Sequence, residues 1–200
     1  MPAEIPAARF PAARIPRCAE GARGYDVAEV DAFLARVRQA LEAPGHAPEE
    51  EHARLLSTHV RAAAFAGARG GYRPEAVDEV LDAAEDALAA AEREEVLRLR
   101  GAEAWQEHVD ALTGLVRGRI DRPRTRRFRH PARSRAQGYS AAHVDVLCER
   151  LGARLAHAAP LEPAELRGAV FPPAHGERGY EEQQVDAFLD RAVQLLLALR

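Results

Sequence analysis

The chain has 200 residues, of which 47% are apolar and 6% aromatic, and its formal net charge is −3. That apolar share excludes a disordered polypeptide, and no run of about 20 apolar residues is present to form a membrane-spanning helix, so we expect a globular cytoplasmic protein, either free or peripheral at the inner face of the membrane. All 28 basic residues are arginine, which together with abundant alanine, glycine and proline indicates a high-GC genome, and we expect an actinobacterial source.

One motif occurs four times: Gly-Tyr followed, five and six residues after the tyrosine, by Val-Asp. The four copies, numbered motifs 1 to 4, are Gly24-Tyr25 with Val30-Asp31, Gly71-Tyr72 with Val77-Asp78, Gly138-Tyr139 with Val144-Asp145, and Gly179-Tyr180 with Val185-Asp186. A leucine stands eleven residues after each of these valines. An internal repeat of this kind predicts similar units packed on one another.

Each motif predicts an irregular arm followed by a helix. The residues after the tyrosine are typical of helix starts: Asp26 with Glu29 as a capping box, Pro74 at a first helical position, Ser140 as an N-cap and Glu181 at the positive end of the helix dipole. The apolar residues that follow have three-and-four spacing, which predicts one buried face per helix. We interpret the four tyrosines as packing residues and the four aspartates as structural pins at the helix starts.

The longest predicted helical segment runs from Pro74 to about Ile120. As one unbroken helix this segment would be about 70 Å long, which is too long for a compact domain, so we expect a break or kink near Gly101. Two short helices are predicted at 48–64 and 163–168, and the arm between 122 and 136 is expected to be irregular.

The repeats divide the chain into four segments. These are residues 1–45 with motif 1, 48–121 with motif 2 and a long helical extension, 122–159 with motif 3, and 160–200 with motif 4. We expect an all-α fold in which four arm-plus-helix repeats pack as a helical bundle or as a pseudo-dimer of coiled-coil-like pairs. The protein would then be a monomer or a homodimer.

The fullest copies read RGYDVAEVDAFLARV at 23–37 and RGYEEQQVDAFLDRAV at 178–193. They resemble the N-terminal module of the DivIVA family of bacterial scaffold proteins. The resemblance implies a scaffold or adaptor linked to cell division or polar growth. It also implies a protein partner, either a DivIVA-type scaffold whose module pairs with an unpaired motif or a second copy of this chain.

The same resemblance implies contact with anionic lipid at the arm tips, where this chain has Arg23 and Arg178. The family has a phenylalanine three residues before the tyrosine, and the four copies here have Ala22, Arg69, Ala136 and Glu177 in that place. The phenylalanines that stand earlier in the arms, at 10, 65, 128 and 171, are predicted to be core residues.

Positive charge is concentrated in one stretch, which we call the arginine segment. Against the single Asp121 it has nine arginines: Arg117, Arg119, Arg122, Arg124, Arg126, Arg127, Arg129, Arg133 and Arg135. Such a segment suits phospholipid headgroups, nucleic-acid phosphates or an acidic protein partner. Alternatively, it lies against the acidic helix that starts at Pro74. Binding to nucleic acid is the least favoured of these interpretations.

Signatures of enzymes and cofactor sites are missing from the sequence. There is no phosphate-cradling glycine-rich loop and no nucleophile elbow, so we expect no catalytic activity and no cofactor. His52 and His59 share a helical face but have no third ligand, and Cys18 and Cys148 match no metal-ligand spacing, so we expect no metal. Cys148 is predicted to be a buried thiol, and Trp105 a core anchor.

Overall fold

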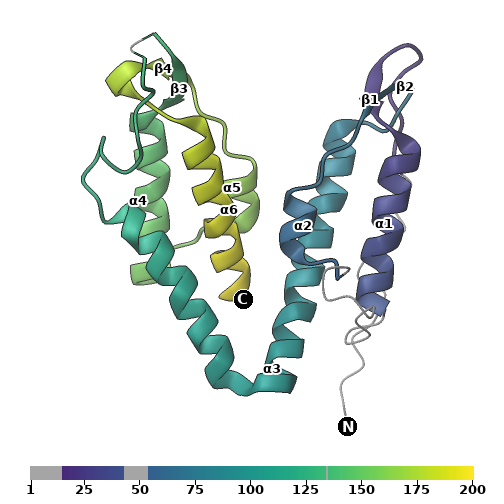
Figure 1. Ribbon diagram of the computed structural model, residues 1–200, viewed down its shortest axis with the longest axis horizontal. Helices are drawn as coiled ribbons and strands as arrows, with labels where there is room; N and C mark the ends of the chain where they lie inside the picture. Colours follow the sequence, from purple (N-terminus) through teal and green to yellow (C-terminus); the bar gives the residue numbers. More distant parts are fainter. Residues whose placement is uncertain (1–14, 43–53, 134) are drawn as a thin grey trace. The chain divides into compact units, whose positions relative to one another are not determined.

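The computed structural model describes residues 15–42, 54–133 and 135–200 (Figure 1). The chain folds as two compact units, Met1–Ala102 (unit 1) and Glu103–Arg200 (unit 2). Motifs 1 and 2 belong to unit 1, and motifs 3 and 4 belong to unit 2. The boundary falls inside the segment 48–121.

Unit 1 contains one small sheet and three helical elements. Strand β1 (Arg23–Tyr25) leads into helix α1 (Val27–Glu42), and the short helix α2 (Ser57–Arg61) precedes strand β2 (Gly67–Arg69) and the first part of helix α3 (Pro74–Ile120). β1 and β2 pair antiparallel with Gly24 opposite Ala68, and they lie together at one end of α1 (Figure 1).

The core of unit 1 is built from the apolar stripes of α1 and α3. Val30 and Val77, from motifs 1 and 2, are completely buried in the same cluster as Ile15, and a second cluster joins Val37 to Leu88. Each such side chain stabilises the fold by roughly 1.5–3 kcal/mol on burial.

Unit 2 contains the second part of α3, a three-stranded sheet and three further α-helices. In chain order these are β3 (Gln137–Ser140), α4 (Ala141–His157), α5 (Pro163–Arg167), β4 (Pro173–His175), the 3-10 helix η3 (Gly176–Arg178), β5 (Gly179–Tyr180) and α6 (Glu182–Ala198). The strand order is β4-β3-β5, and both pairings are antiparallel.

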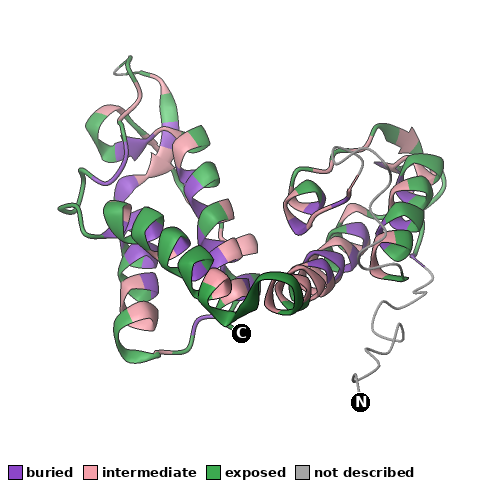
Figure 2. Cartoon of the chain, turned by 60° about the horizontal axis from the view of Figure 1, so that its bottom comes forward, coloured by how far each residue is buried: buried purple, intermediate pink, exposed green. Residues whose placement is uncertain are grey.

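α6 is the most buried helix of unit 2. Val185 and Val193 are fully buried, and the run Leu195–Leu197 is buried on consecutive positions, so neighbours cover more than one face of this helix (Figure 2). Val144 of motif 3 is likewise buried on α4.

The expectation of an all-α helical bundle is wrong. Among the described residues, five strands form two small antiparallel sheets, so each unit is a mixed helix-and-sheet structure. The strands are two to four residues long, too short to show an alternating pattern in the sequence. Where two arms are pressed together, their backbone N–H and C=O groups pair with each other as strands.

The break near Gly101 is confirmed. Gly101 has φ 85° and ψ 175°, so α3 is two helices joined at a glycine whose backbone conformation disfavours any L side chain. The first of these helices begins at Pro74, as the sequence predicts.

The other predicted helix starts are met in different ways. Asp26 Oδ1 accepts a hydrogen bond of 3.0 Å from the Glu29 N–H, which makes Asp26 an N-cap. Ser140 is at the N-cap position of α4 but does not cap with its side chain, because its hydroxyl pairs with His143 Nδ1 at 2.8 Å. Of the helix predicted at 48–64, Ser57–Arg61 is helical, while 48–53 lie outside the described residues. α5 matches the helix predicted at 163–168.

Candidate functional site

The two Gly-Tyr arms of unit 1 cross and pair through their backbones. The Tyr25 N–H donates to the Tyr72 carbonyl, and the Tyr72 N–H donates to the Tyr25 carbonyl, each at 2.9 Å. A Cβ atom at Gly24 would lie 2.1 Å from the Tyr72 carbonyl oxygen, and one at Gly71 would lie 2.2 Å from that of Tyr25. The glycine of each motif is therefore what lets the other arm approach.

Unit 2 repeats this crossing with motifs 3 and 4. Tyr139 lies opposite Tyr180 in the antiparallel β3–β5 pair. A Cβ atom at Gly138 would lie 2.1 Å from the Tyr180 carbonyl oxygen, while one at Gly179 would lie 2.7 Å from the carbonyl oxygen of Ala174. The arms thus pair as 1 with 2 and 3 with 4.

In three cases the tyrosine of one motif is hydrogen-bonded to the aspartate of the motif paired with it. The Tyr72 hydroxyl donates to Asp31 at 3.0 Å. In unit 2 the Tyr180 hydroxyl donates to Asp145 at 3.0 Å, and the Tyr139 hydroxyl is hydrogen-bonded to Asp186. The recurrence of these two residue types therefore reflects an exchange of hydrogen bonds between paired motifs.

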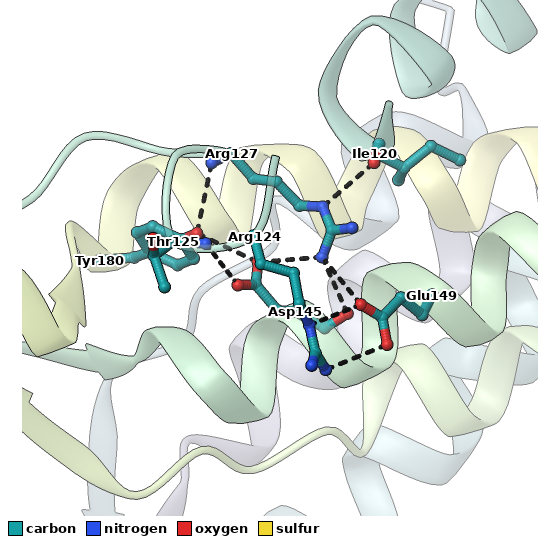
Figure 3. Close-up of polar contacts among 7 residues, drawn as sticks. All are labelled: Ile120, Arg124, Thr125, Arg127, Asp145, Glu149 and Tyr180. Atoms are coloured by element: carbon teal, nitrogen blue, oxygen red, sulfur yellow. Dashed lines mark hydrogen bonds and ion pairs between the residues drawn. The ribbon is translucent and has the colours of Figure 1, made fainter. Parts of the chain in front are cut away.

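The Asp145–Tyr180 pair is the centre of a buried polar cluster (Figure 3). The Arg127 guanidinium lies 3.0 Å from Asp145 Oδ1, and its Nε donates to the carbonyl of Ile120, the last residue of α3, at 3.0 Å. The Arg127 N–H donates to the Tyr180 hydroxyl at 3.2 Å, and the Thr125 N–H donates to Asp145 Oδ2 at 2.7 Å. Because every charge in this cluster is paired and hydrogen-bonded, its burial is tolerated.

Burial perturbs the titrating groups in and beside this cluster. The pKa of the Tyr180 hydroxyl is raised to about 12, mainly by burial; the hydrogen bond from the Arg127 N–H lowers this pKa, and the Asp145 charge raises it. Burial also raises the pKa of the Cys148 thiol to about 12. Both groups are therefore neutral and unreactive near pH 7, as a structural role requires.

A phenylalanine ahead of the Gly-Tyr pair packs against aromatic rings in the arms of motifs 2, 3 and 4. Phe65 contacts Tyr25 and Phe33 with ring centroids 5.6 and 5.7 Å apart, and Phe128 contacts Tyr180 and Phe188, both at 5.2 Å. Phe128 is a buried core residue, as predicted, whereas the phenylalanines at 65 and 171 are only half-buried, the second packing against Tyr139 at 5.3 Å. The phenylalanine at 10 lies outside the described residues.

The arginine segment has two kinds of arginine. Four are engaged by their own unit: Arg127 is buried, Arg124 pairs with Glu149 at 2.7 Å, Arg129 pairs with Glu181 at 3.3 Å, and Arg119 donates to the Arg127 carbonyl at 3.2 Å. The other five are exposed and have no side-chain partner within the described ranges; they are Arg117, Arg122, Arg126, Arg133 and Arg135.

The arm-tip arginines lie in different units and different settings. Arg23 is exposed opposite Arg69 in the β1–β2 pair, and its guanidinium donates to the Gly67 carbonyl at 3.1 Å. Arg178 is exposed at the end of η3. The structure therefore brings Arg23, and not Arg178, together with a second arginine of its own sheet.

The remaining candidates stay apart. Cys18 is half-buried and Cys148 buried, and both are free thiols. Trp105 is half-buried rather than buried, with its ring 5.2 Å from that of His108. In the part of the chain that the structure describes, no group of three His, Cys, Asp or Glu side chains is arranged to hold a metal ion. Nor does any helix among the described residues have the length and apolar character needed to cross a membrane.

Sequence reasoning missed the buried role of Arg127, which it grouped with the surface arginines. A local signal exists: Arg127 directly precedes Phe128, an apolar arm residue ahead of a Gly-Tyr motif. The signal does not by itself place Arg127 beside Asp145. That position depends on the register of the arm, which is fixed by the hydrogen bond of 2.9 Å from the Glu181 N–H to the Arg129 carbonyl.

No protein-family model matches this chain, and comparisons with curated proteins and with solved structures find no match. The function must therefore be argued from the motifs and from the geometry of the two units.

Proposed function

We propose that this chain is a non-catalytic scaffold or adaptor protein of the cytoplasm, and that the resemblance of its motifs to the DivIVA module links it to bacterial cell division or polar growth. One observation carries the proposal: the residues that recur in every motif are used to join motif 1 to 2 and motif 3 to 4. The Cys148 thiol, a side chain that could act as a nucleophile, is buried and held in its neutral form.

This pairing changes the mechanism by which a partner would be recruited. Each described motif has its arm paired inside its own unit, so a partner module would not find an unpaired motif to join. Recruitment through the outer surfaces of the two units is the alternative that fits. It also supports a monomer, which light scattering over a range of concentrations will test through the solution mass.

A co-purification experiment tests the adaptor function. The chain is tagged, immobilised and incubated with a DivIVA-type scaffold protein from the same organism. It should retain this scaffold protein at physiological salt. A double variant of exposed positions on α1, Arg36→Gln with Arg38→Gln, serves as a matched control that should retain the same amount. Failure of the wild-type chain to retain the scaffold would contradict the proposal.

A second candidate function is peripheral binding to an anionic membrane through the arginine segment. Five of its arginines are exposed and have no side-chain partner among the residues that the structure describes, which favours this function at about 1 kcal/mol per basic residue near an anionic surface. Phe128, the one phenylalanine of the segment, is buried, so contact with headgroups is favoured over insertion.

Sedimentation with vesicles separates this candidate from the adaptor. Binding to anionic vesicles should exceed binding to neutral ones and should weaken from low to physiological salt. Replacing the five exposed arginines by glutamine should abolish it, whereas replacing Arg36, Arg38, Arg98 and Arg100 should not. Equal sedimentation with neutral and anionic vesicles would remove this candidate, and a parallel titration with duplex DNA would report nucleic-acid binding by the same arginines.

A further inference from the structure

The two units hold their crossed arms together with unequal strength. Among the described residues, the sheet of unit 2 has three strands, while that of unit 1 has two, extended by isolated bridges at Tyr72. A two-stranded sheet is marginally stable in water and depends on further strands or helices packed against it. Arg23 also lies opposite Arg69 in the β1–β2 pair, and like charges that face each other across two strands repel. The backbone pairing of the arms is therefore weaker in unit 1.

The polar contacts of the paired motifs differ in the same direction. In unit 2, the buried Arg127 lies 3.0 Å from Asp145 of α4, and it is hydrogen-bonded to Tyr180 of the opposite arm and to the last turn of α3. These elements must therefore separate together when the arms part. In unit 1, the hydrogen bond from Tyr72 to Asp31 is exposed to water, where such a bond contributes little to stability.

Aromatic rings are also buried to different depths in the two units. The four rings described in unit 1 are all half-buried; they are Tyr25, Phe33, Phe65 and Tyr72. In unit 2, Phe128, Tyr180 and Phe188 are buried, and the ring of Phe128 packs edge to face on each of the other two at 5.2 Å. Because aromatic side chains bring a large apolar area into a core, their complete burial stabilises unit 2 more than partial burial stabilises unit 1.

The break at Gly101 separates the two units along α3. Its φ of 85° and ψ of 175° lie outside the helical region, so the regular geometry of α3 is interrupted there. The boundary between the two compact units falls next to this break, after Ala102. Loss of structure in the first part of α3 therefore need not spread into the second part.

We propose that unit 1 opens as a separate cooperative unit while unit 2 stays folded. In the open form the β1 and β2 backbones are unpaired, and Val30 and Val77, which are completely buried in the closed form, are uncovered. The chain therefore has a second state, in which one half presents strand edges and apolar side chains. This inference goes beyond the proposed adaptor function, because it concerns the free chain and requires no partner.

Hydrogen exchange of the backbone amides tests the proposal in the full-length wild-type chain. Exchange is followed by mass spectrometry at neutral pH and is corrected for the intrinsic rate of each peptide. Peptides that cover β1 and β2 should exchange at least about tenfold faster than peptides that cover β3 and β5. Equal protection of the two arm crossings, or faster exchange in unit 2, would overturn the proposal.

A disulfide across the arms of unit 1 provides a second test. Arg23 and Arg69 are directly opposed in the β1–β2 register, and such residues lie about 4.5–5.5 Å apart at Cα, within the range of a disulfide. The variant is Arg23→Cys with Arg69→Cys. It also carries Cys18→Ser, because the Cys18 thiol lies 3.4 Å from the Arg23 carbonyl oxygen and would compete for the new thiols.

Oxidation of this variant should slow exchange in unit 1 at least about tenfold and leave exchange in unit 2 unchanged, because the crosslink holds only the arms of motifs 1 and 2 together. The reduced form of the same variant is the matched control, since it has the same sequence without the crosslink. Slowing of both units by the same factor would show that the chain opens as one cooperative unit, and the proposal would then be wrong.

Discussion

The hydroxyl of Tyr180, in motif 4, donates a 3.0 Å hydrogen bond to the carboxylate of Asp145, in motif 3. Each residue therefore recurs in the sequence because of a partner in another copy of the motif. This relationship explains why the pattern combines a tyrosine with an aspartate.

The glycine of motif 3 should tolerate no side chain. Gly138→Ala places a Cβ atom 2.1 Å from the Tyr180 carbonyl oxygen, where only backbone movement makes room, so the free energy of unfolding should fall by about 2–3 kcal/mol. Gly114→Ala is the control: a Cβ there meets nothing within 4 Å inside a helix, and the change should stabilise by about 1 kcal/mol. Urea unfolding of both variants measures the difference, and equal effects would contradict the crossing of the arms.

The buried cluster should be far more sensitive than its exposed counterpart. Asp145→Asn leaves the buried Arg127 charge without its counter-ion and should cost about 3–5 kcal/mol. Asp31→Asn, at an exposed position hydrogen-bonded to Tyr72, should cost about 1 kcal/mol or less. Denaturant unfolding measures both costs. A larger loss of stability for Asp31→Asn than for Asp145→Asn would show that burial does not set the strength of these tyrosine–aspartate hydrogen bonds.

Alkaline pH should destabilise unit 2. The pKa of Tyr180 rises from 10.0 to about 12 on folding, mainly through burial, so the neutral hydroxyl is the form that the folded state favours. The stability linked to it is complete below pH 10 and is lost as the pH rises through about 12. Unfolding midpoints measured from pH 8 upward should fall less steeply for Tyr180→Phe than for the wild type. Parallel pH profiles would contradict this assignment.

The two thiols should react at different rates. Burial raises the pKa of Cys148 to about 12, so this thiol should resist a thiol reagent at pH 8 in the folded protein, whereas the half-buried Cys18 should react. We expect one reactive thiol in the native protein and two in denaturant. Cys18→Ser should remove the native signal, and a native reaction that persists in this variant would place Cys148 at the surface.

The helices of this protein could be read from the sequence because their signals are local. Pro74 at a helix start and the N-cap at Asp26 each depend on neighbours within about one helical turn, and the break at Gly101 follows from the length of the continuous helical segment. The buried faces followed from the same spacing, as Val30 and Val185 illustrate.

The strands and the candidate site could not be read in this way. The hydrogen bonds from Tyr180 to Asp145 and from Arg127 to Tyr180 join residues 35 and 53 positions apart, so no local pattern contains them. The sequence alone determined where helices begin, break and bury a face, and that four equivalent motifs exist. Only the tertiary structure decided which motifs pair, which arm backbones become strands and whether an arginine covers each tyrosine–aspartate pair, because these depend on which distant backbones come within hydrogen-bonding distance.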